Sequence, residues 1–189
     1  NDVPDTRDAE TVRVIAQQYA WNIHYPGPDG RFGATRIDLV DEQDNPIGLD
    51  RSSEFAEDDF TTINQLHIPV NRKIRVDLSS KDVIHNFKLP ELRVSQDAIP
   101  GMVIPVHFTA TSTSEEFLKT TVGTKREGKG LEIACAQLCG LGHYRMKGYV
   151  TIHEEDDYQA WLDEQASYLE EEDGDDWGDD GDDWGDDDW

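Results

Sequence analysis

The chain has 189 residues, enough for one domain with a real core plus extensions, and its formal net charge at pH 7 is −24. The charge is uneven: residues 1–153 hold 22 acidic and 17 basic side chains, whereas residues 154–189 hold 19 acidic side chains and no basic one. Such an acidic balance excludes a nucleic-acid partner, and no apolar run approaches the roughly 20 residues of a membrane helix.

Short runs of β-branched, aliphatic and aromatic residues predict a β-rich body. Polar and apolar side chains alternate strictly through residues 73–78, which is the pattern of a half-buried strand. Gly and Pro separate the runs, and many short strands divided by such turns are typical of a β-sandwich or barrel. The predicted strands are residues 12–21, 64–70, 73–78, 103–110 and 149–153.

Two segments outside these strands have distinct compositions. Residues 41–59 are polar and acidic without a regular period, which predicts a long surface loop. Residues 154–169 place apolar side chains at helical spacing after an acidic start, which predicts a short helix packed on the β body.

The C-terminal residues 170–189 repeat Asp, Trp and Gly with very few aliphatic side chains. This composition predicts a solvated, disordered tail, because it cannot bury enough surface to become ordered. Attraction of a basic partner and adaptation to high salt are two other interpretations of the same charge.

Segment 135–146 gathers both cysteines of the chain, one histidine and one of its two methionines. Thiolate, imidazole and thioether form a soft ligand set that selects copper over hard cations. The thiolates of Cys135 and Cys139 could bridge two copper ions that share one unpaired electron. The cysteines alone are equally compatible with a disulfide or with buried thiols. His143 and Met146 beside them favour a metal site, which requires a second histidine upstream.

His85 provides that histidine, within DVIHNFKLPELRVSQDAIPG at residues 82–101. Together with CAQLCGLGHYRMKG at residues 135–148, this run resembles subunit II of the haem–copper cytochrome c oxidases, in the soluble domain that carries the dinuclear copper centre CuA. The resemblance covers residues 11–153 and implies an all-β, cupredoxin-like Greek-key fold, with residues 1–10 as a lead-in. In this family membrane helices precede the domain, so we expect membrane association through a segment either cut from this sequence or carried by another chain.

The resemblance implies a ligand set for two copper ions. Both thiolates bridge the ions, His85 and Met146 complete one of them, and His143 with the backbone carbonyl of Gln137 completes the other. Two thiolates nearly cancel the charge of a Cu(I)/Cu(II) pair, which limits the cost of burying it. The implied ligands are His85, Cys135, Gln137, Cys139, His143 and Met146.

Some positions carry weaker implications. Many family members have Glu at position 137, where its side chain reaches magnesium or manganese at the boundary with subunit I. Gln137 has no charge, so we do not predict that second metal site. The remaining histidines lie in strand-like runs, and we expect them to be half-exposed or hydrogen-bonded rather than ligands. They are His24, His67, His107 and His153.

The resemblance implies an electron-transfer role on the periplasmic or extracytoplasmic face of the cell membrane. Electrons would come from cytochrome c or an equivalent donor and pass to a haem of subunit I, where oxygen is reduced. The aromatic position that receives them aligns with Tyr19, with Trp21 two residues later, and core aromatics are the alternative for both. Asp82 matches an acidic docking position, and an ordinary exposed side chain is its alternative.

The sequence is also compatible with two other functions. Nitrous oxide reductase carries a CuA domain with a similar loop, but that domain follows a large propeller, and the run at residues 82–101 favours the oxidase. A copper-carrier module is the other alternative. A carrier would release copper readily to a chelator, whereas an electron-transfer centre would hold it.

Overall fold

A computed structural model describes residues 8–174, and the side chains of the C-terminal helix to residue 169. The predicted lead-in at residues 1–10 is described only from residue 8, and residues 175–189 of the predicted tail lie outside the described residues. Among the described residues, no helix is long and apolar enough to cross a membrane.

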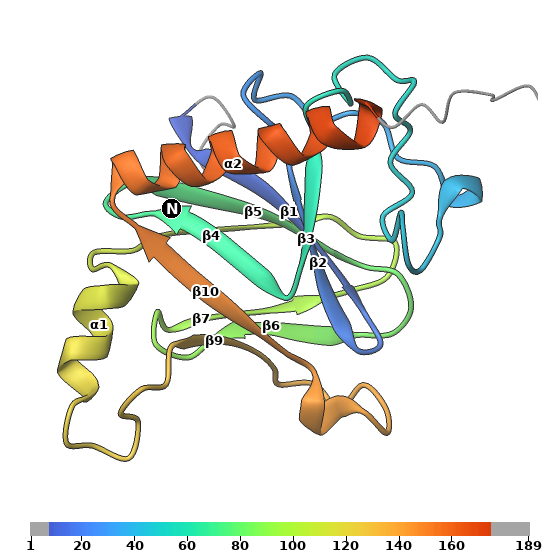
Figure 1. Ribbon diagram of the computed structural model, residues 1–189. Helices are drawn as coiled ribbons and strands as arrows, with labels where there is room; N and C mark the ends of the chain where they lie inside the picture. Colours follow the sequence, from blue (N-terminus) through green and yellow to red (C-terminus); the bar gives the residue numbers. More distant parts are fainter. Residues whose placement is uncertain (1–7, 175–189) are drawn as a thin grey trace, which may run out of the picture.

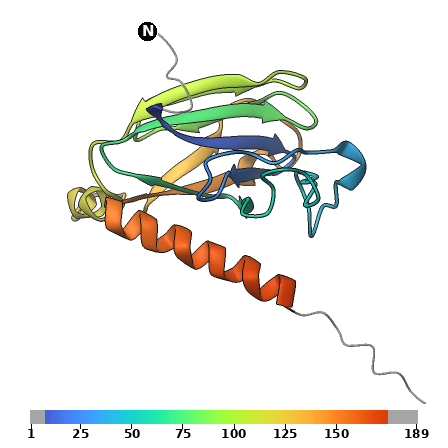
Figure 2. The ribbon, with the colours of Figure 1, turned by 90° about the horizontal axis from the view of Figure 1, so that it is seen from above.

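Two five-stranded sheets form a β-sandwich, as Figures 1 and 2 show. The first sheet has the strand order β3-β2-β1-β5-β8 and the second has the order β4-β10-β9-β6-β7. The pairs β1–β5 and β4–β10 are parallel, and the other pairs are antiparallel. The predicted all-β sandwich is therefore confirmed. The strands are β1 (Glu10–Gln17), β2 (Ala20–Tyr25), β3 (Phe60–Ile63), β4 (Gln65–Pro69), β5 (Lys73–Ser80), β6 (His85–Leu89), β7 (Val94–Ala98), β8 (Ile104–Thr109), β9 (Leu131–Cys135) and β10 (Lys147–His153).

The core lies between the sheets and comes from alternate positions of each strand. In β5, Ile74, Val76 and Leu78 are completely buried, as the alternation predicts. Four strands lie within three residues of their predicted bounds, namely β4, β5, β8 and β10. The sequence pattern missed β3, β6, β7 and β9, which are short.

The predicted single strand over residues 12–21 is wrong, because it is a hairpin. β1 ends at Gln17 and β2 begins at Ala20, with Gln18 and Tyr19 in the turn. The buried apolar residues of β1 fall at even positions, and those of β2, which include Trp21 and Ile23, fall at odd ones. A single strand keeps one phase, so this change of phase marks the turn.

Two α-helices lie outside the sheets. α2 (Glu155–Gly174) confirms the helix predicted at 154–169 and runs five residues further, so residues 170–174 are helical where the start of the disordered tail was predicted. It contacts β3, β4 and β10 and lies along one side of the sandwich (Figure 2). The short helix α1 (Ser114–Thr121) was not predicted, although Thr113 and Glu116 form a capping box that the sequence alone displays.

The long connection between β2 and β3 is irregular, as predicted for residues 41–59. It contains one exposed 3₁₀ turn, η2 (Ile37–Leu39). Its last residue, Asp59, is completely buried and lies 2.6 Å from His24 Nε2. This buried pair fixes the loop to the first sheet.

Candidate metal centre

The predicted ligands meet at one end of the sandwich, where three connections lie side by side. β6 and β9 are neighbours, and their register sets Phe87 opposite Cys135. His85 opens β6 two residues earlier, so it lies next to the cysteine that ends β9. The loop from β9 to β10 contains the 3₁₀ turn η3 (His143–Arg145) and returns at Met146 (Figure 1). Sheet pairing thus joins segments that are about fifty residues apart in the chain.

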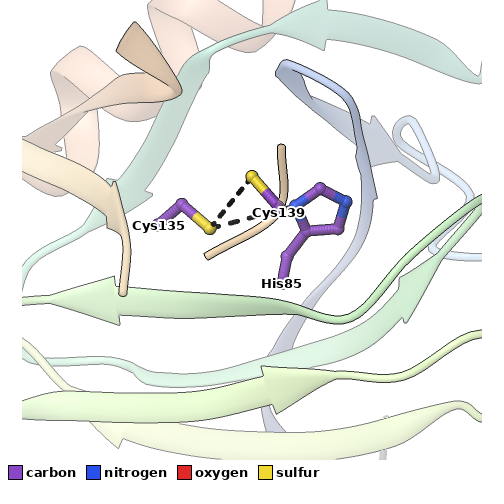
Figure 3. A group of neighbouring side chains, drawn as sticks. All are labelled: His85, Cys135 and Cys139. Atoms are coloured by element: carbon purple, nitrogen blue, oxygen red, sulfur yellow. Dashed lines mark hydrogen bonds between the residues drawn. The ribbon is translucent and has the colours of Figure 1, made fainter. Parts of the chain in front are cut away.

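The two thiols and one imidazole form a compact triangle, drawn in Figure 3. Cys135 Sγ lies 3.8 Å from Cys139 Sγ and 3.9 Å from His85 Nδ1. Both cysteines are free, which removes the disulfide alternative in this structure. A metal ion about 2.3 Å from each sulfur, the distance known for zinc, could contact both at this separation. Among the described residues, this triangle is the one cluster of three His, Cys, Asp or Glu donors close enough to hold a metal ion.

The three remaining predicted ligands surround the thiols. His143 Nδ1 lies 3.6 Å from Cys139 Sγ, and Met146 Sδ lies 3.7 Å from the same sulfur. The carbonyl oxygen of Gln137 lies 3.1 Å from Cys135 Sγ. The structure thus gathers two thiols, two imidazoles, a thioether and a carbonyl around one volume. This soft set fits copper better than magnesium, calcium or manganese.

The surroundings of the two thiols give them different pKa values. Burial, together with the charge of the neighbouring Cys135, raises the pKa of Cys139 to about 11. For Cys135, burial opposes ionisation, but hydrogen bonds from His85 and from the backbone outweigh it and lower the pKa to about 6. Without a cation, one thiolate is therefore the stable state at neutral pH. A metal ion held by Cys135 and Cys139 would favour loss of the second proton, because coordination deprotonates a thiol.

Asp82 contacts the ring of His85 at the nitrogen that faces away from the cysteines. Asp82 Oδ1 lies 2.8 Å from His85 Nε2, which leaves Nδ1 to face the sulfur of Cys135. The carboxylate also accepts hydrogen bonds from the backbone amides of Gln18, at 2.7 Å, and Val83, at 2.6 Å. A carboxylate in this position fixes the orientation of a metal-binding histidine. The predicted docking role of Asp82 stays a prediction, and the side chain is 30% exposed.

The two aromatic candidates lie in different environments. Trp21 is completely buried, with its ring edge-on to His85 at 6.2 Å and to Phe87 at 5.5 Å, so it is a core residue beneath the site. Tyr19 is half-buried in the β1–β2 turn. Its ring packs so closely on the loop that a Cβ atom added at Gly142 would collide with it. Tyr19 therefore packs directly on the loop.

The other histidines lie away from this cluster, as expected. His24 is bonded to Asp59 in the first sheet, and His67 Nδ1 lies 2.8 Å from His153 Nε2 beneath α2. His107 is exposed on β8. His24 is the hydrogen-bonded case of that expectation, since it is completely buried and lies 2.6 Å from Asp59 Oδ2. The buried carboxylate of Asp59 makes that position possible, because it receives the hydrogen bond of the ring.

The family model for the periplasmic domain of cytochrome c oxidase subunit II matches residues 10–152. The chain belongs to this family. The alternative cytochrome c oxidase subunit 2 of Bradyrhizobium diazoefficiens is 35% identical over 162 residues, covering 85% of this chain and 53% of that protein. Cytochrome c oxidase subunit 2 of Thermostichus vulcanus is 37% identical over 150 residues, covering 79% of this chain and 32% of that protein.

A solved structure of this family has the same fold. The crystal structure of the periplasmic domain of cytochrome oxidase subunit II of Bradyrhizobium japonicum superposes with a TM-score of 0.57 at 26% identity. The match covers 89% of this chain and 99% of that domain. The chain spans about half the length, or less, of the curated relatives named above. The fold and the family are thus established for the domain, and the activity of a whole oxidase subunit is a matter for proposal.

Proposed function

We propose that this chain holds a dinuclear copper centre and transfers single electrons from cytochrome c to a haem of subunit I in a haem–copper oxidase. The observation that carries the proposal is the convergence of six soft or weak donors on one volume, from two segments of the chain. Two thiols 3.8 Å apart lie at its centre, flanked by an imidazole on each side. A copper pair bound here would supply a one-electron redox couple spread over both ions.

The side chains around the site support a buried centre that changes little during electron transfer. His85, Cys139 and Met146 are each no more than 4% exposed, so water has little access to three of the ligands. Rigid strands carry or flank Cys135 and His85, which keeps the donors in place when the charge changes. Both features keep solvent and protein reorganisation small.

The rim of the loop presents an apolar surface to partners. Three of its side chains are among the most exposed apolar residues of the described chain. Such a patch marks an interaction site on a protein of this size. It suits contact with subunit I or with the apolar edge of a cytochrome, and Asp82 adds an acidic group beside it. The three side chains are Leu138 at 78% exposure, Leu141 at 96% and Tyr144 at 78%.

Within this proposal, Tyr19 is the better candidate for receiving electrons. Its ring lies over the loop glycines and is partly open to solvent, whereas Trp21 is fully covered. Trp21 instead packs against the edge of His85 and supports the site from the core. The proposed location is the outer face of the cell membrane.

Copper loading tests the proposal directly. The loaded chain should hold two copper ions and show a purple, mixed-valence spectrum with the unpaired electron shared over both nuclei in EPR. Metal analysis giving one copper with a blue single-site spectrum would contradict it. A chelator challenge separates the carrier alternative, because an electron-transfer centre keeps its copper and a carrier gives it up within minutes.

A further inference from the structure

The turn between β1 and β2 touches both segments that supply the candidate copper ligands. Gln18 and Tyr19 form this turn, and its tip lies at the same end of the sandwich as the loop that holds η3 (Figure 1). The sequence pattern assigns no role to Gln18, which is an exposed residue. Its contacts show that it is more than a solvent-facing turn residue.

Gln18 makes one hydrogen bond to each ligand segment. Its side-chain Nε2 donates to the backbone carbonyl of Cys139. Its backbone amide donates to Asp82 Oδ2 at 2.7 Å, and the other oxygen of that carboxylate lies 2.8 Å from His85 Nε2. One residue thus links a bridging cysteine to the carboxylate that orients a histidine on a different loop.

These contacts close a ring around the site. On one side, His85, Cys135 and Cys139 meet through their ligand atoms at 3.9 and 3.8 Å. On the other side, Asp82 and Gln18 join the same two loops through hydrogen bonds. A dinuclear site needs its ligands held to within roughly 0.5 Å, and loops drift more than that unless something outside the ligand set joins them.

The fit of the turn against the loop is tight. A Cβ atom added at Gly140 would lie 2.7 Å from the amide nitrogen of Gln18 and 2.6 Å from the hydroxyl of Tyr19. Gly140 also has a φ of +136°, a conformation that side chains disfavour. The glycine therefore lets the loop approach closely enough for the Gln18 amide to reach the carbonyl of Cys139.

We propose that Gln18 is a positioning residue that sets the Cys139 loop relative to His85 and so shapes the copper site. This inference rests on the proposed function, since it concerns the geometry of that same centre. The side-chain amide is the part of Gln18 that a substitution can remove, while the backbone hydrogen bond to Asp82 remains.

Gln17, the preceding residue, offers a matched control. Its side chain makes hydrogen bonds to Glu42 at 2.8 Å, to Asn22 at 3.0 Å and to Lys81 at 2.6 Å. None of these partners is a candidate copper ligand. Gln17→Met therefore removes more hydrogen bonds from the same hairpin than Gln18→Met does, without touching the loop.

The experiment compares Gln18→Met, Gln18→Glu and Gln17→Met in the full chain, first without copper. Hydrogen exchange of the backbone amides in residues 136–146 is followed by mass spectrometry. Both Gln18 variants should speed exchange of this segment about fivefold, the size expected for losing one hydrogen bond, because neither side chain can donate at neutral pH. Gln17→Met should leave the segment at the wild-type rate. Wild-type exchange in the Gln18 variants, or equal acceleration by Gln17→Met, would overturn the inference.

The second arm uses copper-loaded protein and the copper(I) chelator bathocuproine disulfonate after reduction. The Gln18 variants should lose copper roughly tenfold faster than wild type and show a shifted visible spectrum, whereas Gln17→Met should match wild type in both. Wild-type release and spectrum in the Gln18 variants would overturn the inference even if amide exchange changes. Failure of the wild-type chain to take up copper would instead refute the proposed function, and the amide-exchange arm alone would then decide whether Gln18 positions the loop.

Discussion

Among the described residues, two clusters each contain two histidines, and only the one around the cysteines has three donors close enough to hold a metal ion. At the end of the sandwich, His85 and His143 each turn Nδ1 toward a cysteine sulfur, at 3.9 and 3.6 Å. Beneath α2, His67 and His153 turn ring nitrogens toward each other at 2.8 Å, and Trp161 stacks on His67 at 4.2 Å.

The difference shows what makes a ligand set. The imidazoles beneath α2 already satisfy one another, and an aromatic ring covers them, so they stabilise packing. The donors around the cysteines point toward one another, and hydrogen bonds among them in their neutral forms cannot satisfy every donor. Convergent donors of this kind are what a soft cation stabilises.

Removing one thiol should have the largest effect on the first cluster. Cys135→Ser or Cys139→Ser should each abolish the shared two-copper state, because a hydroxyl is a poor bridge for soft copper. EPR of the loaded variants measures this. A His67→Gln variant serves as the control and should keep the two-copper signal. A mixed-valence signal that survives in either serine variant would show that the bridging assignment is wrong.

Removing the aromatic cover should have the largest effect on the second cluster. Trp161 stacks on His67 and packs edge-on against Tyr25 and Phe60. Trp161→Ala should lower the free energy of unfolding by about 2 kcal/mol, less than for a fully buried Trp because the side chain is only partly buried. Urea unfolding measures it. Tyr168→Ala on the same helix, which removes a ring that is 53% exposed, should cost about 0.5 kcal/mol or less. Loss of bound copper in Trp161→Ala would show that the two clusters are coupled.

Lowering the pH should destabilise the fold through the histidine pair beneath α2. Burial, with a smaller contribution from His153, lowers the pKa of His67 from 6.5 to about 4. Between pH 6.5 and 4, His67 is therefore protonated in the unfolded chain and neutral in the folded chain. Its contribution to the free energy of unfolding is complete above pH 6.5 and is lost as the pH falls toward 4. The full shift corresponds to roughly 3 kcal/mol, and solvent screening of the half-buried ring reduces it to about 1 kcal/mol.

His67→Gln isolates this contribution. Urea unfolding at pH 7.5 and pH 4.5 should show a smaller loss of stability in the variant than in the wild type, by about 1 kcal/mol. The carboxylates titrate in both proteins and cancel in the comparison. An equal loss in both would mean that the pair beneath α2 accepts a proton without cost.

The smallest effects should come from the weak ligands of the first cluster. Met146→Leu removes a thioether from the oxidised state and should raise the reduction potential, whereas Gln137→Ala keeps the backbone carbonyl and should leave two coppers and a nearly unchanged spectrum. Voltammetry and EPR compare them in one background. Should Gln137→Ala bleach the centre while Met146→Leu leaves the potential unchanged, the assignment of the two weak ligands is wrong.

The sequence by itself determined the chemistry of the site and the class of the fold. Two thiols, an imidazole and a thioether within residues 135–146 define a soft ligand set wherever the segment lies. Alternation in β5 is equally local, because successive side chains of a strand point to opposite faces. The helical spacing of residues 154–169 likewise predicts α2. The residues of the capping box of α1 are also visible in the sequence.

Only the tertiary structure decided how distant segments meet. The bond from Gln18 to Cys139 joins residues 121 positions apart, and the pairing of His67 with His153 spans 86. No local period encodes such contacts, because they depend on which strands are neighbours and on their register. Strand pairing also explains why Tyr19 packs on the loop while Trp21 lies in the core. The two residues are two positions apart in the chain, but Tyr19 belongs to the turn and Trp21 to strand β2.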